Sequence, residues 1–314
     1  MKKLSKFLIL LGVSIALMFV CLKNDSSVLC FKTPEQINSE APETDTAELF
    51  SMPFYDLKPK ELKNRAEFTT RYVNSSEERK HNIKLAAKSL NNVLIDVGGE
   101  LSFNRTVGRR TESRGYKTAK IISGGQFVDG VGGGVCQVST TLYNAAILAG
   151  LCVTEYHHHS LPVGYVAPSF DAMVNSGSAD LRFVNNTHNP IIIKTKADDN
   201  CLTVTIIGEP LNGYYVRESV IKEYIPAPEY KRVTDIKNEY PDLYEGETKI
   251  IKYSKQGLKS EGFIKYIKNG KVVFRQKIRH DTYSPAQGII VVGTAERPDT
   301  AVPPDTKIPG SEQL

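Results

Sequence analysis

The chain has few cysteines, and their number argues against a disulfide scaffold. Its 314 residues contain five. Exported proteins that depend on disulfides have many cysteines, usually in even number. Here an odd number, three, remains beyond residue 30. A Cys152–Cys201 bridge that leaves Cys136 free is one alternative, but we expect all three thiols to be reduced. The five cysteines are Cys21, Cys30, Cys136, Cys152 and Cys201.

The sequence also lacks a block of basic residues, a phosphate-binding loop and long internal repeats. Its 40 Lys and Arg residues are nearly balanced by 35 Asp and Glu residues, which gives a net charge of +5 spread along the chain. Without a basic patch or alternating basic and aromatic residues, nucleic acid is not expected as a partner. The small positive charge is compatible with a place near an anionic cell wall.

Long hydrophobic runs are scarce as well, and the one at residues 7–22 follows three lysines. Lysines ahead of an apolar run are typical of an export signal whose N-terminus stays in the cytoplasm. No Ala-x-Ala-like cleavage site follows, and the residues before Cys21 are too bulky for a lipoprotein site. We therefore expect residues 1–22 to be an uncleaved signal anchor, with a cleaved signal peptide and secretion as the alternative. In both cases the rest of the chain is extracytoplasmic.

Composition divides the rest of the chain into four segments. Residues 23–53 are polar and indicate a stalk, and residues 54–210 have a globular pattern. Residues 213–294 contain alternating apolar and polar segments that predict a small all-β module, with a hairpin turn at Asn269-Gly270. The proline-rich residues 295–314 are expected to form a disordered tail.

Two main helices are predicted in the first globular segment. A capping signature opens the first one, and its apolar face is expected to run from Ile83 to Leu94. The second helix is predicted from Val135 to Ala149, with Gly150 as its C-terminal stop.

Strand-like residues follow these helices and make the first domain α+β. Short apolar segments are separated by Asn- and Asp-rich turns, which predicts an antiparallel meander. The expected strands are 180–184, 191–195 and 202–207.

The most informative residues lie at the start of the second predicted helix. Gly132-Gly133-Gly134 leads almost directly into Cys136. A thiol at a helix N-terminus lies near unpaired N–H groups and the positive end of the helix dipole, which stabilise a thiolate. Three consecutive histidines, His157–His159, follow. Cysteine with a nearby histidine indicates nucleophilic acyl chemistry, although a buried helix cysteine beside a polar loop has the same pattern.

Chain length allows these histidines to return to the thiol. Residues 151–159 can span about 30 Å when extended, which exceeds the roughly 22 Å length of the predicted helix. His159 reaches furthest and is therefore the first choice as the base, with His157 second. For His158 we expect a packed or surface position.

These residues resemble the VanW-domain family over about residues 60–210. A second resemblance, to the G-five module, covers Tyr266 to Gly293 and includes Asp281-Thr282-Tyr283. That module is a small β domain often attached to cell-wall enzymes. The residues that carry the first resemblance are Leu101–Asn104 with Val107-Gly108, Gly132–Asn144, His157, His159–Val163, Asp171 and Ala172.

The first resemblance implies a protein of the bacterial cell envelope, from a family named after a gene in vancomycin-resistance clusters. It also implies an L,D-transpeptidase activity in which Cys136 is the nucleophile. Such an enzyme attacks a peptidoglycan stem peptide at its third residue, expels D-alanine and forms a thioester, which an amine from a second stem resolves. His157 and His159 match the family's histidine pair. The implied partners are peptidoglycan stem peptides, and the cytoplasmic membrane through the anchor. No cofactor is expected.

Several further residues are candidates to support this chemistry. Backbone N–H groups near Gly133 and Gly134 are candidate oxyanion donors because glycine allows close approach, unless these glycines only make a tight turn. Asp171 and Asp180 are candidates to orient the histidine, although aspartates near turns more often act as caps. The residues expected to hydrogen-bond near the thiol are Gln137, Ser139 and Thr140.

Three other interpretations remain open. A zinc site has suitable ligand types in the histidines and Cys136, but no further Cys or Glu at metal-binding spacing supports it. A thiol peptidase would form the same intermediate and use water as the acceptor. A non-catalytic protein that binds peptidoglycan or its precursors, linked to glycopeptide resistance, needs no reactive thiol. We expect the C-terminal module to localise the protein to the wall and to be dispensable for chemistry.

Overall fold

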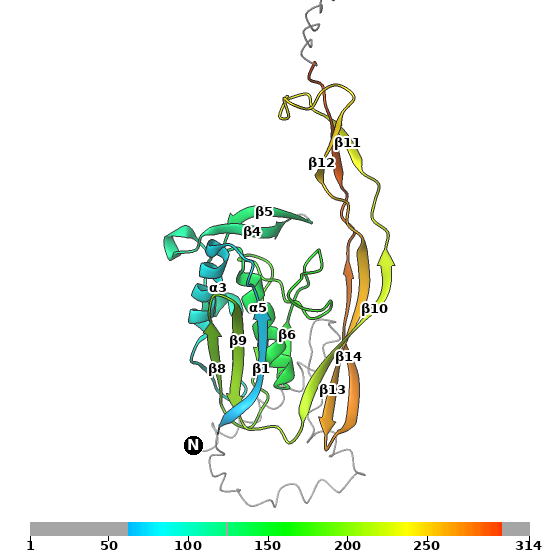
Figure 1. Cartoon of the computed structure of the whole chain (residues 1–314). Helices are drawn as coiled ribbons and strands as arrows, with labels where there is room; N and C mark the ends of the chain where they lie inside the picture. Colours follow the sequence, from blue (N-terminus) through cyan, green and yellow to red (C-terminus); the bar gives the residue numbers. More distant parts are fainter. Residues whose placement is uncertain (1–61, 124, 297–314) are drawn as a thin grey trace, which may run out of the picture. The chain divides into compact units, whose positions relative to one another are not determined.

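The structure is a computed structural model that describes residues 62–123 and 125–296 (Figure 1). The expected signal anchor at 1–22, the stalk at 23–53 and almost all of the expected tail lie outside the described residues. Among the residues described, no helix is long and apolar enough to cross a membrane. Within the same ranges the fold is α+β, with mostly antiparallel sheets and three α-helices.

The chain divides into two compact units. The first comprises Met1–Ile225 with Gly257–Ser284, and the second comprises Pro226–Gln256 with Pro285–Leu314. The segment predicted as one small β module, 213–294, is therefore shared between them.

A four-stranded antiparallel sheet and two helices form the body of the first unit. The strand order is β1-β9-β8-β2. Helices α3 and α5 contact each other, and between them they contact β1, β8 and β9 (Figure 1). The bounds are β1 Lys63–Arg71, α3 Glu77–Leu90, β2 Val93–Ile95, α5 Val135–Leu148, β8 Ile191–Ala197 and β9 Cys201–Gly208.

Helix α3 ends earlier than its apolar face predicted. Its N-cap is Ser76, whose side chain accepts a hydrogen bond from the Arg79 N–H at 3.4 Å. The chain turns at Asn92, where φ is +67°. Val93 and Leu94, expected on the helix, instead lie in β2 opposite β8. The prediction was wrong at these two positions because apolar residues at the end of a helix and in a short strand have the same pattern.

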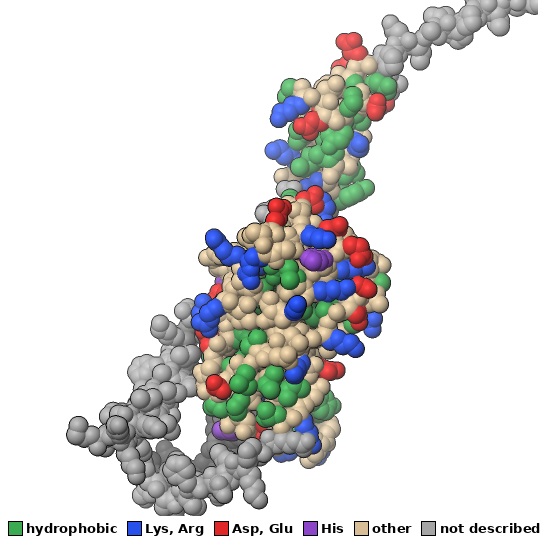
Figure 2. All heavy atoms as spheres, turned by 90° about the vertical axis from the view of Figure 1, so that its left-hand side faces the viewer, with side chains coloured by type: hydrophobic (Ala, Val, Ile, Leu, Met, Phe, Trp, Pro, Cys, Tyr) green, Lys and Arg blue, Asp and Glu red, His purple; other side chains and the backbone are tan. Residues whose placement is uncertain are grey.

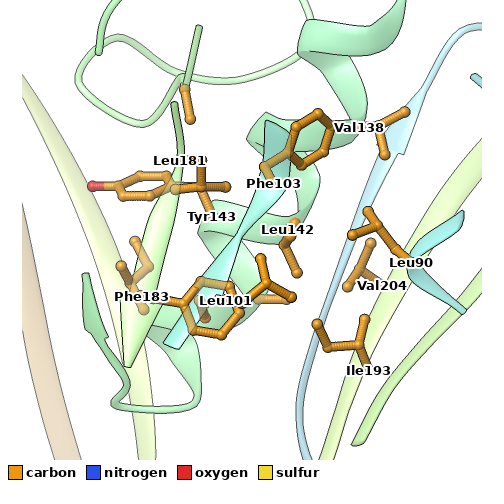
Figure 3. Packing of buried hydrophobic residues seen from close by; sticks show 14 of the residues in the cluster. Leu90, Leu101, Phe103, Val138, Leu142, Tyr143, Leu181, Phe183, Ile193 and Val204 are labelled. Atoms are coloured by element: carbon orange, nitrogen blue, oxygen red, sulfur yellow. The ribbon is translucent and has the colours of Figure 1, made fainter. Parts of the chain in front are cut away.

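Helix α5 confirms its predicted bounds within one residue. Its N-cap Gly134 has φ +109°, and Gly150, just after the C-cap, has φ +73°. Every residue of α5 is buried except Cys136 and Leu148. In Figure 3, Leu142 lies between Phe183 on one side and Val204 on the other. Fully burying a leucine contributes about 1.5–3 kcal/mol, so α5 is a fixed support for the one partly exposed residue near its start.

A second, three-stranded sheet lies on the other side of α5. Its order is β3-β7-β6. The strand predicted at 180–184 is β7, but it pairs with β3 and β6 rather than with β8. The expected meander is therefore correct only for β8 and β9, because turn residues do not determine which sheet a strand joins. The bounds are β3 Glu100–Ser102, β6 Cys152–Glu155 and β7 Arg182–Val184.

Short elements connect these layers near the start of α5. Helix α4 follows β3, and a single 3-10 turn, η2, comes before a two-stranded hairpin, β4-β5. The hairpin leads into the glycine run ahead of α5. The bounds are α4 Phe103–Val107, η2 Glu112–Arg114, β4 Thr118–Ser123 and β5 Gln126–Val131.

The sheet β10-β13-β14 completes the first unit. The predicted hairpin at Asn269-Gly270 is confirmed, and both residues have positive φ, +51° and +73°. Strand β10 contacts α5. The strands are β10 Tyr214–Ile225, β13 Gly257–Lys268 and β14 Lys271–Tyr283.

The second unit is a small sheet with the order β11-β15-β12, in which β11 runs parallel to β15. On the face of the described residues shown in Figure 2, Lys and Arg side chains are interspersed with Asp and Glu side chains. The strands are β11 Lys231–Thr234, β12 Thr248–Lys252 and β15 Ile289–Val292.

One prediction about the cysteines is wrong. Cys152 is in a disulfide, so not all three of these thiols are reduced. Cys136 and Cys201 are free, so the alternative Cys152–Cys201 bridge is not formed either.

Candidate active site

The Cys136 thiol lies at the N-terminus of α5. It is half-buried, and its Sγ is 3.3 Å from the Val174 carbonyl oxygen. The N–H groups of Val135 and Gln137 donate to Gly132 O and Gly134 O, respectively. The Cys136 N–H donates no hydrogen bond within the described residues. A helix N-terminus leaves such donors unpaired, so this N–H is available beside the thiol.

The two glycines proposed as oxyanion donors have clear structural roles. A Cβ on Gly133 would be 2.8 Å from backbone atoms of Ala119 in β4, and Gly134 has φ +109°. A side chain is therefore disfavoured at both positions by close packing or by the backbone. The tight turn places their N–H groups next to the start of α5.

His159 and Asp171 form a buried pair next to the thiol. Their exposed fractions are 5% and 1%. Asp171 Oδ2 accepts hydrogen bonds from the His159 backbone N–H and from Nδ1, each at 2.7 Å. This contact fixes the imidazole and leaves its Nε2 available, and His159 lies close enough to Cys136 for each group to shift the pKa of the other.

The three groups shift one another's pKa values. Burial raises the pKa of the Cys136 thiol, but the hydrogen bond and charge of His159, together with Arg110, bring it below its ordinary value. Burial lowers the pKa of His159, whereas its hydrogen bonds to Asp171 and Cys136 raise it to about 9. Burial raises the pKa of Asp171, but His159 and Arg279 lower it to about 2. At neutral pH these shifts favour a thiolate, an imidazolium and a carboxylate that titrate as one unit.

Polar side chains on α5 hold the segment that carries Asp171. Ser139 Oγ donates to Ala172 O at 2.6 Å, and the Ala172 N–H donates to Thr140 Oγ1 at 2.9 Å. Asn144 Nδ2 donates to Phe170 O at 2.8 Å. Ser139 and Thr140 were expected to bind near the thiol; the structure shows that their side chains hold the backbone beside Asp171.

The other side of Asp171 faces strand β14. Tyr283 Oη donates to Asp171 Oδ1 at 2.5 Å, and Arg279 Nη1 donates to Asp171 O at 2.5 Å. Asp281 lies 3.0 Å from Arg279 Nη2. These contacts argue against the expectation that the C-terminal module is dispensable for chemistry.

The remaining predicted residues lie in other networks. His157 Nε2 is 3.0 Å from Glu155 Oε1, and His158 Nδ1 is 2.8 Å from His159 O. Asp180 accepts hydrogen bonds from Ser102 Oγ at 2.5 Å and from the Asn104 N–H at 2.8 Å. The structure therefore gives Asp180 contacts that hold the start of α4, and none to His159 among the described residues.

Gln137 also has a structural place. Its Nε2 donates to Thr70 Oγ1 at 3.1 Å and to Arg71 O at 3.0 Å, and its Oε1 accepts from Arg79 at 3.0 Å. These bonds link α5 to β1 and α3 and do not involve the thiol.

Two residues near the thiol were missed from the sequence. The Arg110 guanidinium is half-buried, donates to Asn104 Oδ1 at 2.7 Å, and has no ion pair with an acidic residue in the described part of the chain. Burial strongly raises the pKa of the Tyr165 hydroxyl, and the charge of Cys136 adds to this shift. Neither residue lies in a helical or glycine-rich pattern that points to Cys136.

Within residues 62–123 and 125–296, no group of three or more His, Cys, Asp or Glu side chains has the geometry of a metal site. The histidine run itself is divided, because His157 pairs with Glu155 and His159 with Asp171. The arrangement brings together a thiol, an imidazole and a carboxylate, which can perform nucleophilic chemistry.

Comparisons with known proteins identify two domains. The family model described as "VanW like protein" matches residues 78–207, and the G5 domain model matches residues 212–295. "Uncharacterized protein YoaR" of Bacillus subtilis (strain 168) is 41% identical over 152 residues, which are 48% of this chain and 50% of that protein. "Vancomycin B-type resistance protein VanW" of Enterococcus faecalis (strain ATCC 700802 / V583) is 29% identical over 158 residues, 46% of this chain and 58% of that protein. The chain thus spans about half the length of these curated relatives.

Two solved structures are similar to the C-terminal part. "IgA1 Protease G5 domain structure" has 26% identity and a TM-score of 0.18, and the match covers 26% of this chain and 89% of that one. "Crystal structure of HP0197-G5" has 20% identity and a TM-score of 0.14, and the match covers 25% of this chain and 97% of that one. On the two family matches alone, the chain is a VanW-domain protein with a C-terminal G5 module.

Proposed function

We propose that this protein is a cysteine-dependent acyltransferase of the L,D-transpeptidase type that acts on peptidoglycan stem peptides. The observation that carries the proposal is the buried, hydrogen-bonded His159–Asp171 pair beside Cys136. The Asp171–His159 contact at 2.7 Å orients the imidazole, and the pKa shifts favour a thiolate beside an imidazolium. Nucleophile, base and orienting carboxylate are the three parts of a nucleophilic acyl-transfer site.

The first half of the reaction forms a thioester. The Cys136 thiolate attacks the carbonyl carbon that joins the third stem residue to D-alanine, and a C–S bond forms. The C–N bond then breaks, and the leaving amine takes the proton of the His159 imidazolium. In the second half an amine of another stem attacks the thioester and gives its proton to His159. The C–S bond breaks, the thiolate is restored, and no oxidant, reductant or cofactor is consumed.

Other groups at the start of α5 support the charges that develop. The Cys136 N–H and the N–H groups of the preceding glycines are the proposed oxyanion donors. Arg110 carries a positive charge near the thiol without an acidic partner among the described residues. We propose that it binds a carboxylate of the stem peptide, because guanidinium groups bind carboxylates with charge-assisted hydrogen bonds.

The proposed place of action is the outer side of the bacterial membrane. The lysine-flanked apolar run at residues 1–22 supports a signal anchor with the N-terminus inside, or a cleaved signal peptide. The name of one relative links that protein to vancomycin resistance, and its domain is shared here. We therefore propose an association with the cell wall and with glycopeptide resistance, with the G5 module as a contact to the wall.

Incubation of the full chain with purified disaccharide-tetrapeptide muropeptides tests this function, with products identified by mass. The expected product is a cross-linked dimer that has lost one D-alanine, and Cys136→Ala should abolish it. Cys201→Ser is the matched control, because it removes the other free thiol of the described residues. If tripeptides form without cross-linked dimers, water is the acceptor and the activity is hydrolysis instead of transfer. Unchanged muropeptides that still bind the protein would favour a non-catalytic binding protein.

A further inference from the structure

We propose that strand β14 of the G5 domain supplies positioning residues, Tyr283 and Arg279, for the His159–Asp171 pair of the VanW domain. The inference rests on the proposed use of this pair and goes beyond it, because it gives the G5 domain a part in the chemistry. The family match for the VanW domain ends at residue 207, whereas both positioning residues lie within the G5 match at 212–295.

The two oxygens of Asp171 are divided between the two domains. Oδ2 accepts both of its hydrogen bonds from His159 of the VanW domain. Oδ1 accepts its hydrogen bond from Tyr283 Oη at 2.5 Å, and Arg279 Nη2 lies 3.7 Å away. Because a carboxylate is planar, fixing Oδ1 from β14 sets the direction in which Oδ2 meets the imidazole.

Because Asp171 is buried, these contacts determine whether its carboxylate stays ionised. The side chains of Asp171 and Arg279 are 1% and 0% exposed. An ionised carboxylate without solvent needs donors or a cation to stay ionised. Arg279 supplies the cation and Tyr283 a donor, so the charge that orients His159 depends on β14.

The Tyr283 hydroxyl also fixes the approach of the two segments. It accepts a hydrogen bond from the Ser169 N–H at 2.8 Å while it donates to Asp171. Ser169 Oγ lies 2.7 Å from Ser260 Oγ of β13. A Cβ on Gly262 would lie 3.0 Å from the Ser169 carbonyl oxygen. These contacts hold β13 and β14 in register with the segment that carries Asp171.

Asp281 affects the ionised form of Asp171 in the opposite direction to Tyr283. Its carboxylate lies 3.0 Å from Arg279 Nη2, closer than that nitrogen lies to Asp171. Asp281 therefore competes with Asp171 for the same guanidinium. Loss of the Tyr283 hydroxyl should destabilise the ionised Asp171, whereas loss of the Asp281 charge should stabilise it. Loosened packing alone would not produce opposite shifts.

The test is the pH dependence of Cys136 alkylation by iodoacetamide in the full chain with the Cys201→Ser background. The low-pH limb of the profile is the pH range in which the alkylation rate rises as the thiolate forms. Tyr283→Phe should move this limb to higher pH by about one pH unit, which corresponds to losing one hydrogen bond to a charged group. Asp281→Asn should move the same limb to lower pH. Tyr266→Phe is the matched control, because it removes a tyrosine hydroxyl of the same sheet that bonds Asn212 Oδ1 at 2.5 Å, and it should leave the limb in place.

An unchanged limb in a folded Tyr283→Phe variant would overturn the inference, and so would an equal shift in Tyr266→Phe. If circular dichroism shows that Tyr283→Phe does not fold, Asp281→Asn decides: a downward shift supports the inference, and no shift or an upward shift overturns it. Alkylation requires no muropeptide. Failure here is therefore distinguishable from failure of the transferase proposal, which the product analysis tests.

Discussion

Cys136 and Cys201 are both free and half-buried, yet their surroundings shift the thiol pKa in opposite directions. Cys201 begins strand β9, and its Sγ lies 3.5 Å from Asp198 Oδ2. Burial and this carboxylate raise the pKa of Cys201. At Cys136 the carboxylate of Asp171 acts through His159.

The difference shows what the imidazole contributes. A carboxylate in direct contact with a thiol opposes a second negative charge, whereas a carboxylate behind an imidazole stabilises the imidazolium that in turn stabilises the thiolate. The Cys136 surroundings therefore predict a reactive thiol, and the Cys201 surroundings predict an ordinary one.

Removing the imidazole should give the largest effect, because it makes Cys136 resemble Cys201. We expect His159→Ala to lower the acyl-transfer rate by roughly 10²–10⁴-fold, the contribution of a general acid–base group. The control is His158→Ala, which removes a ring that lies against Tyr283 at 5.5 Å between centroids and should cost far less. Muropeptide product formation measures both. A larger loss in His158→Ala would remove His159 from the role of base.

The second-largest effect is expected in the pH dependence of alkylation, which should differ between Cys136 and Cys201. Cys136 should be alkylated already below pH 8.5, about the ordinary thiol pKa, because its own pKa is lowered. Cys201 should react only above that value, since its pKa is raised. Acyl transfer should also fall as the pH rises through about 9, where His159 loses the proton that the leaving amine needs. Peptide mass mapping after alkylation distinguishes the thiols, and identical profiles would contradict this account.

The smallest effect in this series is expected at Arg110. Its charge helps to lower the pKa of Cys136, whereas at Cys201 burial and the Asp198 carboxylate raise the pKa despite the nearby charge of Arg71. Arg110→Gln should lower kcat/KM by roughly tenfold, as expected for one charge-assisted hydrogen bond, while Arg110→Lys should retain most of the activity. Equal losses in the two variants would point to packing against Gly132 rather than to charge.

The parts of the fold that the sequence predicts best depend on local chemistry. Gly134 and Gly150 bound α5 because each adopts positive φ, and Asn269-Gly270 makes the hairpin for the same reason. Apolar spacing alone was less reliable: Val93 and Leu94 lie in a strand, since tertiary pairing with β8 determines their conformation.

The site shows the same limit more clearly. Cys136 at a helix start, and His159 ahead of His157, follow from caps and chain length. The partners of Asp171 do not, because Arg279 and Tyr283 are more than a hundred residues away along the chain. The sequence assigns Asp281-Thr282-Tyr283 to a separate module. No periodicity relates it to Asp171, and only the packing of β14 brings the two together.

Mass spectrometry of the intact protein after incubation with a tetrapeptide stem tests the central claim most directly. We predict one adduct whose mass equals the stem minus D-alanine, attached at Cys136 and released by an added amine. It should form in Cys201→Ser and be absent in Cys136→Ala. The absence of an adduct from a folded protein that binds the stem, or an adduct that persists in Cys136→Ala, would contradict the account.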